Sequence, residues 1–261
     1  MRVAIVIPAR FASSRLPGKP LLRETGKYLI QHVFEQAQKA KCASEVIVAT
    51  DDDRIFGAVR DFGGRPVMTR DDHIAGTDRV AEVAAHLTAD VVINLQGDEP
   101  QLDPKAIDLL AELMGTGSDM ATLAVPIADL DTYRSPNVVK VVCDGRGRAL
   151  YFSRSPIPFV RDGVPDFSAR PAQFLQHLGV YAYRREFLLQ IAGAPPHSLE
   201  QSEKLEQLRV LGTGGSINVG VVAEAHRGVD TPADYAEFVR WYRQTGDGGT
   251  HGSTTWFARG L

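Results

Sequence analysis

Apolar and polar positions alternate along the chain in two kinds of block, short apolar runs and longer amphipathic stretches. Continuous apolar runs of about four to eight residues are typical of parallel strands that are buried on both faces. Such runs predict strands over residues 3–7, 45–49, 66–69 and 90–95. Apolar residues at helical spacing predict helices over 28–41, 53–62, 77–87 and 104–114. This alternation is typical of βαβ units and predicts an α/β fold, with a mainly parallel central sheet covered by helices.

The pattern changes from Met120 onwards. Strand-like runs follow at 120–127, 138–143, 148–153 and 178–183, with Asp144-Gly145 as a hairpin-type turn. A stretch rich in Pro, Arg and Asp predicts a long loop at 155–172. A helix at 201–211, a strand at 217–222 and a helix at 232–244 return to the α/β pattern. We therefore expect one domain over 1–245, with a strand-rich insertion at about 128–190, and a disordered Gly-rich tail at 246–261.

Charge and cysteine content narrow the class of protein. With a formal net charge of −3, the chain has no general attraction for nucleic acid or for an anionic membrane surface, so any anion site must be local. No apolar run reaches the length of a membrane span, and the apolar start is too short for a signal peptide. Cys42 and Cys143 are far apart in sequence, which favours reduced thiols over a disulfide framework or a zinc site. We expect a cytoplasmic protein without a nucleic-acid or membrane partner.

The first strand leads into the basic stretch PARFASSRLPGKPL, residues 8–21. Gly18 and the small residues at 12–14 let backbone amides approach a ligand, while Arg10, Arg15 and Lys19 supply charged donors. A triphosphate fits this description, and a solvated loop explains three basic residues equally well. The spacing is not that of a Walker loop, and no dinucleotide-binding glycine motif is present.

Two acidic loops follow strands of the same predicted sheet. INLQGDEP, residues 93–100, delivers Asp98 beyond the carboxyl end of a strand, where ligands bind in open parallel sheets. A carboxylate opposite a phosphate-binding loop is placed to hold Mg²⁺; the alternative is a turn in which Asp98 bonds its own backbone. In GVDTPADY, residues 228–235, Thr231 caps a helix and Asp230 stands outside the cap. Asp230 is a second candidate metal ligand, or else a charge that complements the helix dipole.

The order of motifs carries a resemblance to a known family. The stretches PARFASSRLPGKPL, VIVATDD, GTDRVAEV, INLQGDEP, HLGVYAYR, EKLEQLRVL and GVDTP together resemble the 3-deoxy-D-manno-octulosonate cytidylyltransferases over residues 2–240. GVDTP alone is a weak signal, whereas HLGVYAYR combined with EKLEQLRVL is specific. The resemblance implies a three-layer nucleotidyltransferase fold, similar to that of the nucleotide-diphospho-sugar transferases. It also implies a transferase that joins CTP to the sugar acid Kdo with Mg²⁺, giving CMP-Kdo and pyrophosphate for lipopolysaccharide biosynthesis, and a homodimer formed through the strand-rich insertion.

The resemblance also assigns roles to individual residues. It implies catalytic roles for Lys19, Arg10, Asp98 and Asp230, with both aspartates as metal ligands. It places CTP against Pro8, Ala9, Arg10, Arg15, Lys19, Arg70, Gly76 and Thr77. It places Kdo against Gln96, Arg154, His177, Tyr181, Glu206 and Gln207. Taken singly, several of these have plainer explanations: Tyr181 as core, His177 as a surface or satisfied histidine, and Glu206 with Gln207 as the solvated face of a helix.

Two departures from the family pattern concern the nucleotide. The family commonly has His-Gln-Ser-Gly-Thr where this chain has His73-Ile74-Ala75-Gly76-Thr77, so two polar side chains are replaced by apolar ones. Selectivity for CTP would then be weakened or depend on backbone groups. Tyr28, where the family usually has proline, is expected to be harmless at a helix start. The alternatives to Kdo transfer are a cytidylyltransferase for 8-amino-Kdo or sialic acid, and a catalytically silent nucleotide-binding relative.

Overall fold

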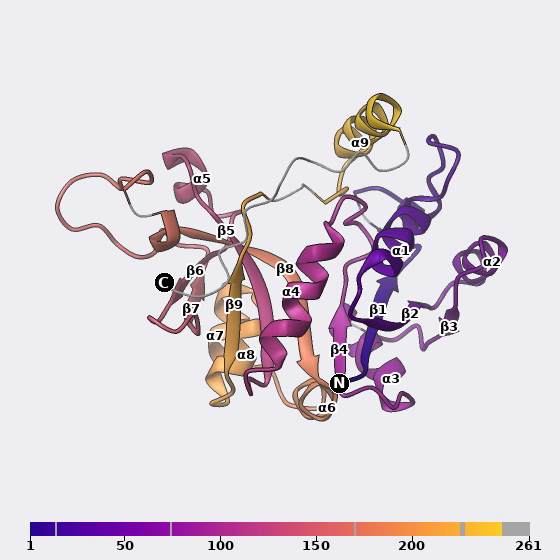
Figure 1. The fold of residues 1–261 in the computed structure, drawn as a ribbon, viewed down its shortest axis with the longest axis horizontal. Helices are drawn as coiled ribbons and strands as arrows, with labels where there is room; N and C mark the ends of the chain where they lie inside the picture. The colour runs from indigo at the N-terminus through magenta and orange to yellow at the C-terminus, as the bar shows by residue number, and fades with distance from the viewer. Residues whose placement is uncertain (14, 74, 170, 225–227, 247–261) are drawn as a thin grey trace. The chain divides into compact units, whose positions relative to one another are not determined.

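The computed structural model describes residues 1–246 except 14, 74, 170 and 225–227, and these fall into two compact units (Figure 1). The first unit contains the described residues of 1–111 and of 228–246. The second unit contains the described residues of 112–224. The tail predicted to be disordered lies, apart from Gly246, outside the described residues.

The first unit is built on four parallel strands in the order β3-β2-β1-β4. They are β1 (Val3–Ala9), β2 (Ala43–Thr50), β3 (Pro66–Met68) and β4 (Val91–Asn94). In the register of the sheet, Ile5 lies between Val46 of β2 and Ile93 of β4. Every residue of β1 is buried except Pro8, which is half-buried, so both faces of this strand are covered. The predicted parallel sheet of α/β type is confirmed here.

Helices surround this sheet: α1 (Leu29–Lys39), α2 (Asp53–Asp61), α3 (Gly76–Ala85) and α9 (Pro232–Thr245), with a 3₁₀ turn at Lys19–Leu21. α4 (Pro104–Met114) begins at the predicted proline. In α1 the buried positions Leu29, Ile30, Val33, Phe34 and Ala37 follow helical spacing, and they pack towards β1 and β2. α1 and α9 share a second apolar cluster in which Leu29 meets Tyr235, Phe238 and Val239.

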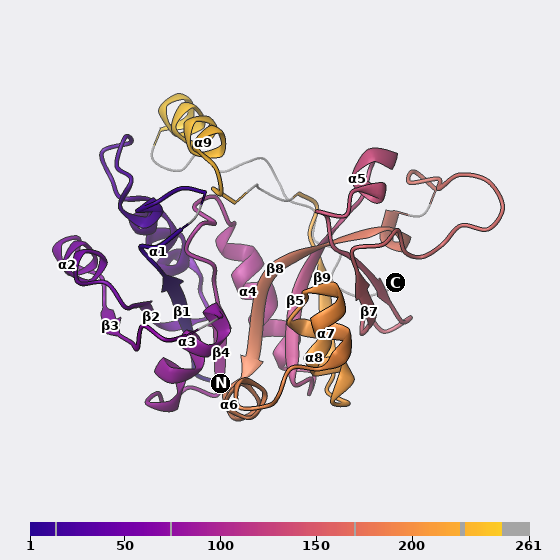
Figure 2. The ribbon, with the colours of Figure 1, turned by 180° about the vertical axis from the view of Figure 1, so that it is seen from behind.

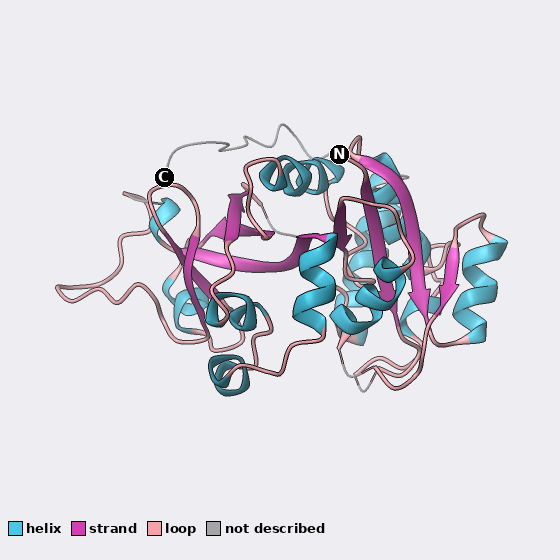
Figure 3. Ribbon diagram, turned by 90° about the horizontal axis from the view of Figure 1, so that it is seen from below, coloured by secondary structure: helices cyan, strands magenta, loops and turns pink. Residues whose placement is uncertain are grey.

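The second unit is a mixed sheet (Figures 2 and 3). β5 (Met120–Pro126) pairs antiparallel with β8 (Leu175–Arg184) and parallel with β9 (Ile217–Val221). β6 (Lys140–Cys143) pairs antiparallel with β7 (Ala149–Ser153) and with β8. The β6–β7 turn is held by Asp144, whose Oδ1 accepts hydrogen bonds from the backbone N–H groups of Arg146 and Arg148. The strand-rich character predicted for this region is confirmed.

The helices of the second unit differ from the prediction. They are α5 (Leu130–Arg134), α6 (Arg185–Ala192), α7 (Ser198–Glu203) and α8 (Gln207–Gly212), with a 3₁₀ turn at Pro171–Gln173. The single helix predicted at 201–211 is wrong, because Lys204 adopts a left-handed conformation with φ of 54° and separates α7 from α8. α5 and α6 were not predicted. Residues 155–169 form no helix or strand, in agreement with the predicted long loop.

Two organisational predictions stay predictions. The first is the strand-rich insertion beginning at about 128, because the second unit begins earlier, at residue 112. The second is the single domain over 1–245, which the division into two compact units does not test.

Among the described residues, every helix is too short or too polar to cross a lipid bilayer.

Candidate functional site

Three loops of the first unit bring the predicted basic and acidic residues together. The Nζ atom of Lys19 lies 2.8 Å from Oδ2 of Asp98 and 3.3 Å from Oδ1 of Asp230. Arg15 reaches the other oxygen of Asp230, with NH2 at 3.1 Å from Oδ2. The Lys19 side chain is 13% exposed, whereas that of Arg15 is 64% exposed. Lys19 is therefore the inner cation of the group and Arg15 the outer one.

Backbone contacts hold these loops in place. A Cβ atom added to Gly97 would lie 2.8 Å from the carbonyl oxygen of Pro8, so only glycine allows the loop after β4 to lie this close to the end of β1. The N–H of Val229 donates to the carbonyl of Asp98 at 2.8 Å, which fastens the loop before α9 to the loop after β4. Gly18, with φ of 68°, starts the 3₁₀ turn that carries Lys19. The juxtaposition of Lys19, Asp98 and Asp230 is thus built into the backbone.

Asp230 is not needed to cap α9. The side chain of Thr231 accepts a hydrogen bond from the N–H of Asp234, and the Asp234 carboxylate accepts in return from the N–H of Thr231. This reciprocal capping box satisfies the start of the helix. The Asp230 carboxylate contacts Lys19 and Arg15 instead. The alternative that Asp230 only complements the dipole of α9 therefore does not account for its contacts.

Glu99 is a third carboxyl group in the same cluster, and the sequence analysis did not select it. Burial, together with the charges of Asp98 and Asp230, raises the pKa of Glu99 to about 8, against the opposing effect of Lys19. Its Oε1 atom lies 3.0 Å from the position of a Cβ added at Gly228. The available signal was the second acidic residue in GDEP, directly after Asp98.

This donor set suits a hard divalent cation. Two carboxylates share one lysine and one exposed arginine, and a third carboxyl group lies beside them, with a pKa raised mainly by burial and further by the two neighbouring carboxylates. Among the described residues there is no group of three or more His, Cys, Asp or Glu side chains arranged to hold a metal by themselves. Asp98 and Asp230 can therefore supply part of a coordination shell, with the remaining ligands coming from a bound substrate or from water.

The residues predicted to contact the nucleotide lie around the ends of β1 and β4 and the start of α3. Gly76 opens α3, and a Cβ added there would meet the ring of Pro8 at 3.5 Å. Ala9 is buried and Arg10 and Thr77 are half-buried. Arg70 is exposed and ion-paired with Asp72 at 3.0 Å. Gly76 and Pro8 are thus close together, while Arg70 lies on the surface.

The segment 70–77 is anchored on α3. Glu82 of this helix accepts a hydrogen bond from the N–H of Arg70 at 3.2 Å and bonds the ring of His73. The N–H of Ala75 donates to the carboxylate of Asp78 at 3.1 Å, so backbone groups order the position where the family has serine. Ile74, the other departure from the family pattern, lies outside the described residues.

Gln96 was predicted to contact the sugar acid. Its Nε2 atom donates to Oδ1 of Asn94 at 3.3 Å, and its Oε1 atom lies 4.0 Å from the position of a Cβ added at Gly76. It therefore lies at the end of β4, beside residues predicted to hold the nucleotide.

The second unit contains the other residues predicted to contact Kdo. His177 is the third residue of β8, which begins three residues before the predicted strand at 178–183, and it is buried. The pairing of β8 with β5 shifts between Thr122 and Leu123 and skips residues 179–180. His177 and Tyr181 nevertheless lie on the same face, with ring centroids 5.5 Å apart. Gly179 in HLGVYAYR is one of the two skipped residues, which is consistent with the enrichment of glycine at bulges.

The protonation of His177 follows from its contacts. Burial lowers its pKa to about 3, so the ring is neutral near pH 7. Thr122 Oγ1 lies 2.8 Å from the carbonyl of Val180 and 2.9 Å from Nε2 of His177. Because the hydroxyl donates its single hydrogen to the carbonyl, it accepts the hydrogen on Nε2. Nδ1 is then the acceptor of the His177 ring.

Tyr181 and Gln207 also meet in this unit. The Tyr181 hydroxyl donates to Oε1 of Gln207 at 3.3 Å, and burial raises the pKa of this phenol. Gln207 is 4% exposed, and its Nε2 atom has no hydrogen-bond partner among the described residues. The plainer explanation of Gln207 as part of a solvated helix face is therefore wrong, whereas Glu206 is exposed. A buried amide donor without a partner is costly, and it marks Gln207 as a candidate ligand-binding side chain.

Arg154 is fixed by carbonyl groups. Its Nε atom donates to the carbonyl of Glu203 at 2.8 Å, and its NH1 atom donates to that of Pro136 at 3.1 Å. Among the described residues no carboxylate lies within ion-pair distance of this guanidinium. The positive charge of Arg154 is therefore oriented but not neutralised.

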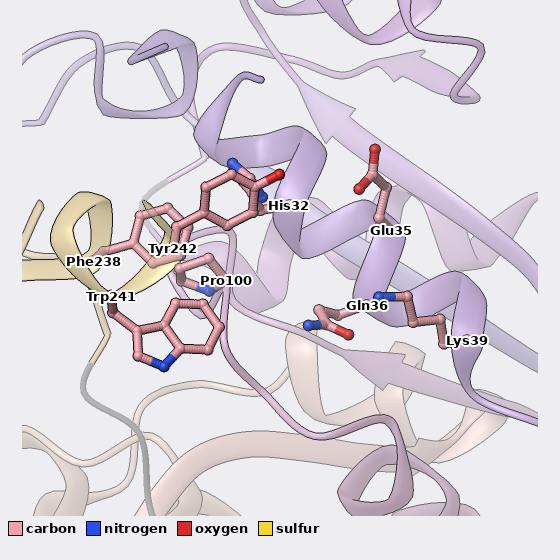
Figure 4. A pocket seen from close by; sticks show the side chains of 8 residues that line it. All are labelled: His32, Glu35, Gln36, Lys39, Pro100, Phe238, Trp241 and Tyr242. Carbon is pink, nitrogen blue, oxygen red and sulfur yellow. The ribbon is translucent and has the colours of Figure 1, made fainter. Parts of the chain in front are cut away.

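A pocket of the first unit lies between α1 and α9 (Figure 4). Aromatic rings from α9 and His32 of α1 form one side, and polar side chains of α1 form the other. The lining residues are His32, Glu35, Gln36, Lys39, Pro100, Phe238, Trp241 and Tyr242. His32 contacts Phe238 and Tyr242 edge-on, at centroid distances of 5.0 and 4.7 Å. These contacts pack α9, and with it the loop carrying Asp230, against α1.

Comparison with known proteins gives a consistent result. The family described as "Cytidylyltransferase" matches residues 4–217. The chain is 52% identical over 241 residues to the 3-deoxy-manno-octulosonate cytidylyltransferase of Geotalea daltonii, covering 90% of this chain and 95% of that protein. It is likewise 52% identical over 239 residues to the enzyme of the same name from Syntrophobacter fumaroxidans, covering 90% and 94% of the two chains.

Solved structures are similar over the same length. A CMP:2-keto-3-deoxy-manno-octonic acid synthetase complexed with CTP superposes with a TM-score of 0.88 at 46% identity, covering 94% of this chain and 99% of that one. A Bacillus anthracis protein that is provisionally named a glucose-1-phosphate thymidylyltransferase, with a TM-score of 0.65 at 14% identity, shares the fold alone. The predicted nucleotidyltransferase fold is confirmed.

Proposed function

The chain belongs to the 3-deoxy-manno-octulosonate cytidylyltransferase family, and we propose that it transfers CMP from CTP to the anomeric hydroxyl of Kdo, giving CMP-Kdo and pyrophosphate. The observation that carries this proposal is the meeting of Lys19 with Asp98 and Asp230, from three loops, at the carboxyl end of a parallel sheet. A basic loop opposite paired carboxylates provides what nucleotidyl transfer needs, because phosphate charge must be neutralised while nucleophile and leaving group are aligned.

The residues of the first unit would handle the triphosphate. Lys19 and Arg10 neutralise charge on the phosphates, and Arg15 assists from the exposed rim. Asp98 and Asp230 would hold Mg²⁺, which when bound would supply a positive charge shared with phosphate oxygens. Lys19 contacts both carboxylates, and a substrate phosphate would compete with them for its ammonium group.

The base would be recognised at the ends of β1 and α3. We assign Pro8, Ala9 and the segment 70–77, including Gly76 and Thr77, to the cytosine. The exocyclic amine of cytosine donates hydrogen bonds where uracil presents an acceptor, so backbone carbonyls can tell the two bases apart. This chain has apolar residues at 74 and 75, and backbone recognition is the mechanism that those residues permit.

The sugar acid would be bound by charged and neutral hydrogen-bonding groups. Arg154, whose guanidinium makes no ion pair among the described residues, would take the carboxylate of Kdo. His177 through Nδ1 and Gln207 through Nε2 would pair with hydroxyl groups. Tyr181, Glu206 and Gln96 complete the proposed set. We propose no histidine base: Asp98 and Asp230 would hold a divalent metal ion, which would supply the positive charge that makes the attacking hydroxyl group more acidic.

A pyrophosphate-release assay tests this proposal. Wild-type protein with CTP and Mg²⁺ is offered Kdo, 8-amino-Kdo and sialic acid in parallel, and Kdo should give the highest kcat/KM. Preference for one of the other two would replace the sugar in the proposal, and no release with any of them would favour a silent relative. In the same assay, Asp98→Asn should lower kcat by about a hundredfold to a thousandfold, since one lost charge-stabilising group typically costs about 10²–10³ in kcat. Asp61→Asn, on the exposed end of α2, is the matched control.

We further propose a cytoplasmic homodimer that acts in lipopolysaccharide biosynthesis. Leu150, Phe159 and Val164 are apolar and 61%, 83% and 73% exposed, and all three lie in or near the strand-rich region predicted to form the interface. Cys42 and Cys143 are both free thiols, as a reducing compartment requires. Sedimentation of Phe159→Asp beside the wild type tests the interface, with a single monomeric species expected for the variant only.

A further inference from the structure

Lys140, in the middle of the second unit, is fully buried. Its ammonium group donates to three backbone carbonyls, those of Ser135 at 2.9 Å, Val138 at 2.7 Å and Arg154 at 2.5 Å. Lysine is almost never fully buried unless its charge is compensated. Burial lowers the pKa of Lys140, while the nearby Glu203 carboxylate opposes that effect. Three carbonyls and one carboxylate therefore compensate the buried charge.

Glu203 holds the same segment from the other side. Its carboxylate accepts hydrogen bonds from the Ser153 hydroxyl at 2.6 Å and from the N–H of Arg154 at 3.0 Å. Its backbone carbonyl accepts from Nε of Arg154 at 2.8 Å. Arg154 is thus held at its backbone N–H, its backbone carbonyl and its side-chain Nε, by only two residues.

This arrangement decides which edge of the Arg154 guanidinium is available. Nε and one N–H of NH1 are occupied by carbonyls, so the N–H groups of NH2 and the second N–H of NH1 remain for an anion. Those groups lie at the far end of the side chain, and a carboxylate can pair with them in a bidentate manner. The direction of that end depends on the positions of the Arg154 backbone and Nε.

We propose that Lys140 and Glu203 are positioning residues that aim Arg154 at the carboxylate of the sugar acid. This inference rests on the proposed function and adds to it two residues that do not touch the substrate. A framework role alone would be satisfied by apolar side chains, which commonly replace buried charges at no cost in stability. Lys140 instead carries a buried ammonium group that has the carbonyl of Arg154 among its three acceptors, and a positioning role explains this contact.

A matched control is available in the same unit. Arg184, at the other end of β8, also donates to backbone carbonyls, through Nε to Ser118 at 3.0 Å and through NH2 to Met114 at 3.3 Å. Arg184 has no contact with Arg154 or Glu203 among the interactions of the described residues. Its loss should perturb the framework of the unit without changing the proposed sugar site.

The experiment measures kcat and both KM values for Lys140→Met, Arg184→Met, Arg154→Ala and the double variant Lys140→Met/Arg154→Ala. In Lys140→Met we expect KM for Kdo to rise about tenfold or more, with KM for CTP within about twofold of the wild type, since a buried charge-assisted hydrogen bond is worth about a factor of ten. Because Lys140 acts through Arg154, the double variant should bind Kdo no worse than Arg154→Ala alone. In Arg184→Met both KM values should stay near those of the wild type.

Each other outcome has a defined meaning. Equal rises in both KM values, or additive losses in the double variant, would overturn the positioning role while leaving the proposed function intact. Wild-type protein that makes no CMP-Kdo would instead overturn the proposed function. If Lys140→Met does not fold, Glu203→Gln, which keeps the side-chain shape, carries the test with the same selective rise in KM for Kdo expected. Failure of both to fold, with Arg184→Met folded, would make the pair part of the framework and overturn the proposal.

Discussion

The buried His177 should make the protein less stable in acid, and the size of this effect follows from its environment. The imidazole is 8% exposed, and burial lowers its pKa from an ordinary 6.5 to about 3. Between these values the unfolded chain binds a proton at this site and the folded chain does not. The contribution of neutral His177 to the free energy of unfolding is therefore fully present above about pH 6.5. It is lost progressively as the pH falls towards 3, at about 1.4 kcal/mol per pH unit. From pH 7.5 to 5 the expected loss is about 2 kcal/mol.

The substitution His177→Gln isolates this contribution. Glutamine can donate to Thr122 Oγ1, as the imidazole does at 2.9 Å, but it does not titrate. Free energies of unfolding from urea titrations at pH 7.5 and 5 should fall by about 2 kcal/mol less in the variant than in the wild type. The neighbouring Tyr181 does not interfere, because its raised pKa keeps it neutral throughout. An identical pH dependence in both proteins would refute the conclusion that His177 is buried and neutral.

Three further predictions concern the first unit. Lys19→Met should lower kcat far more than Arg15→Gln does, because the Lys19 side chain is 13% and the Arg15 side chain 64% exposed; equal losses of kcat in steady-state assays would contradict the inner and outer assignment. Gly97→Ala should lower the free energy of unfolding by about 1–3 kcal/mol and reduce activity, since the new Cβ would lie 2.8 Å from the carbonyl of Pro8; an unchanged midpoint in urea would argue against this close approach. Gly57→Ala, inside α2 with no atom within 4 Å of the new Cβ, should instead raise the free energy of unfolding by about 0.5–1 kcal/mol, and a loss would contradict the open environment.

Local pattern was sufficient for much of the first unit. The apolar runs became buried parallel strands, and the apolar stripe of residues 28–41 became the buried face of α1, because the spacing of apolar residues along the chain distinguishes a strand from a helix. The cap before α9 could also be predicted from sequence, because Thr231, Pro232 and Asp234 lie within one helical turn of each other. The loops of the candidate site could be placed at one edge because parallel strands end on the same side of a sheet.

Local pattern failed where a neighbour distant in sequence decides the conformation. The break between α7 and α8 depends on a left-handed Lys204, which carries no sequence signal of its own. His177 was expected at the start of a strand, but β8 begins earlier because its first residues pair with β5 and β6. Gln207 was predicted to contact Kdo, with a solvated helix face as the plainer explanation; the local pattern did not show that it is buried beside Tyr181.

The sequence by itself therefore determined which residue types bear the chemistry and the strand ends at which the loops of the first unit meet. Only the tertiary structure decided that Lys19 lies between Asp98 and Asp230, that the pKa of Glu99 is raised beside them, and that Lys140 and Glu203 hold Arg154. The physical reason is that strand and helix formation is governed by periodic burial along the chain, whereas charge pairing and desolvation depend on distances between atoms that are far apart in sequence.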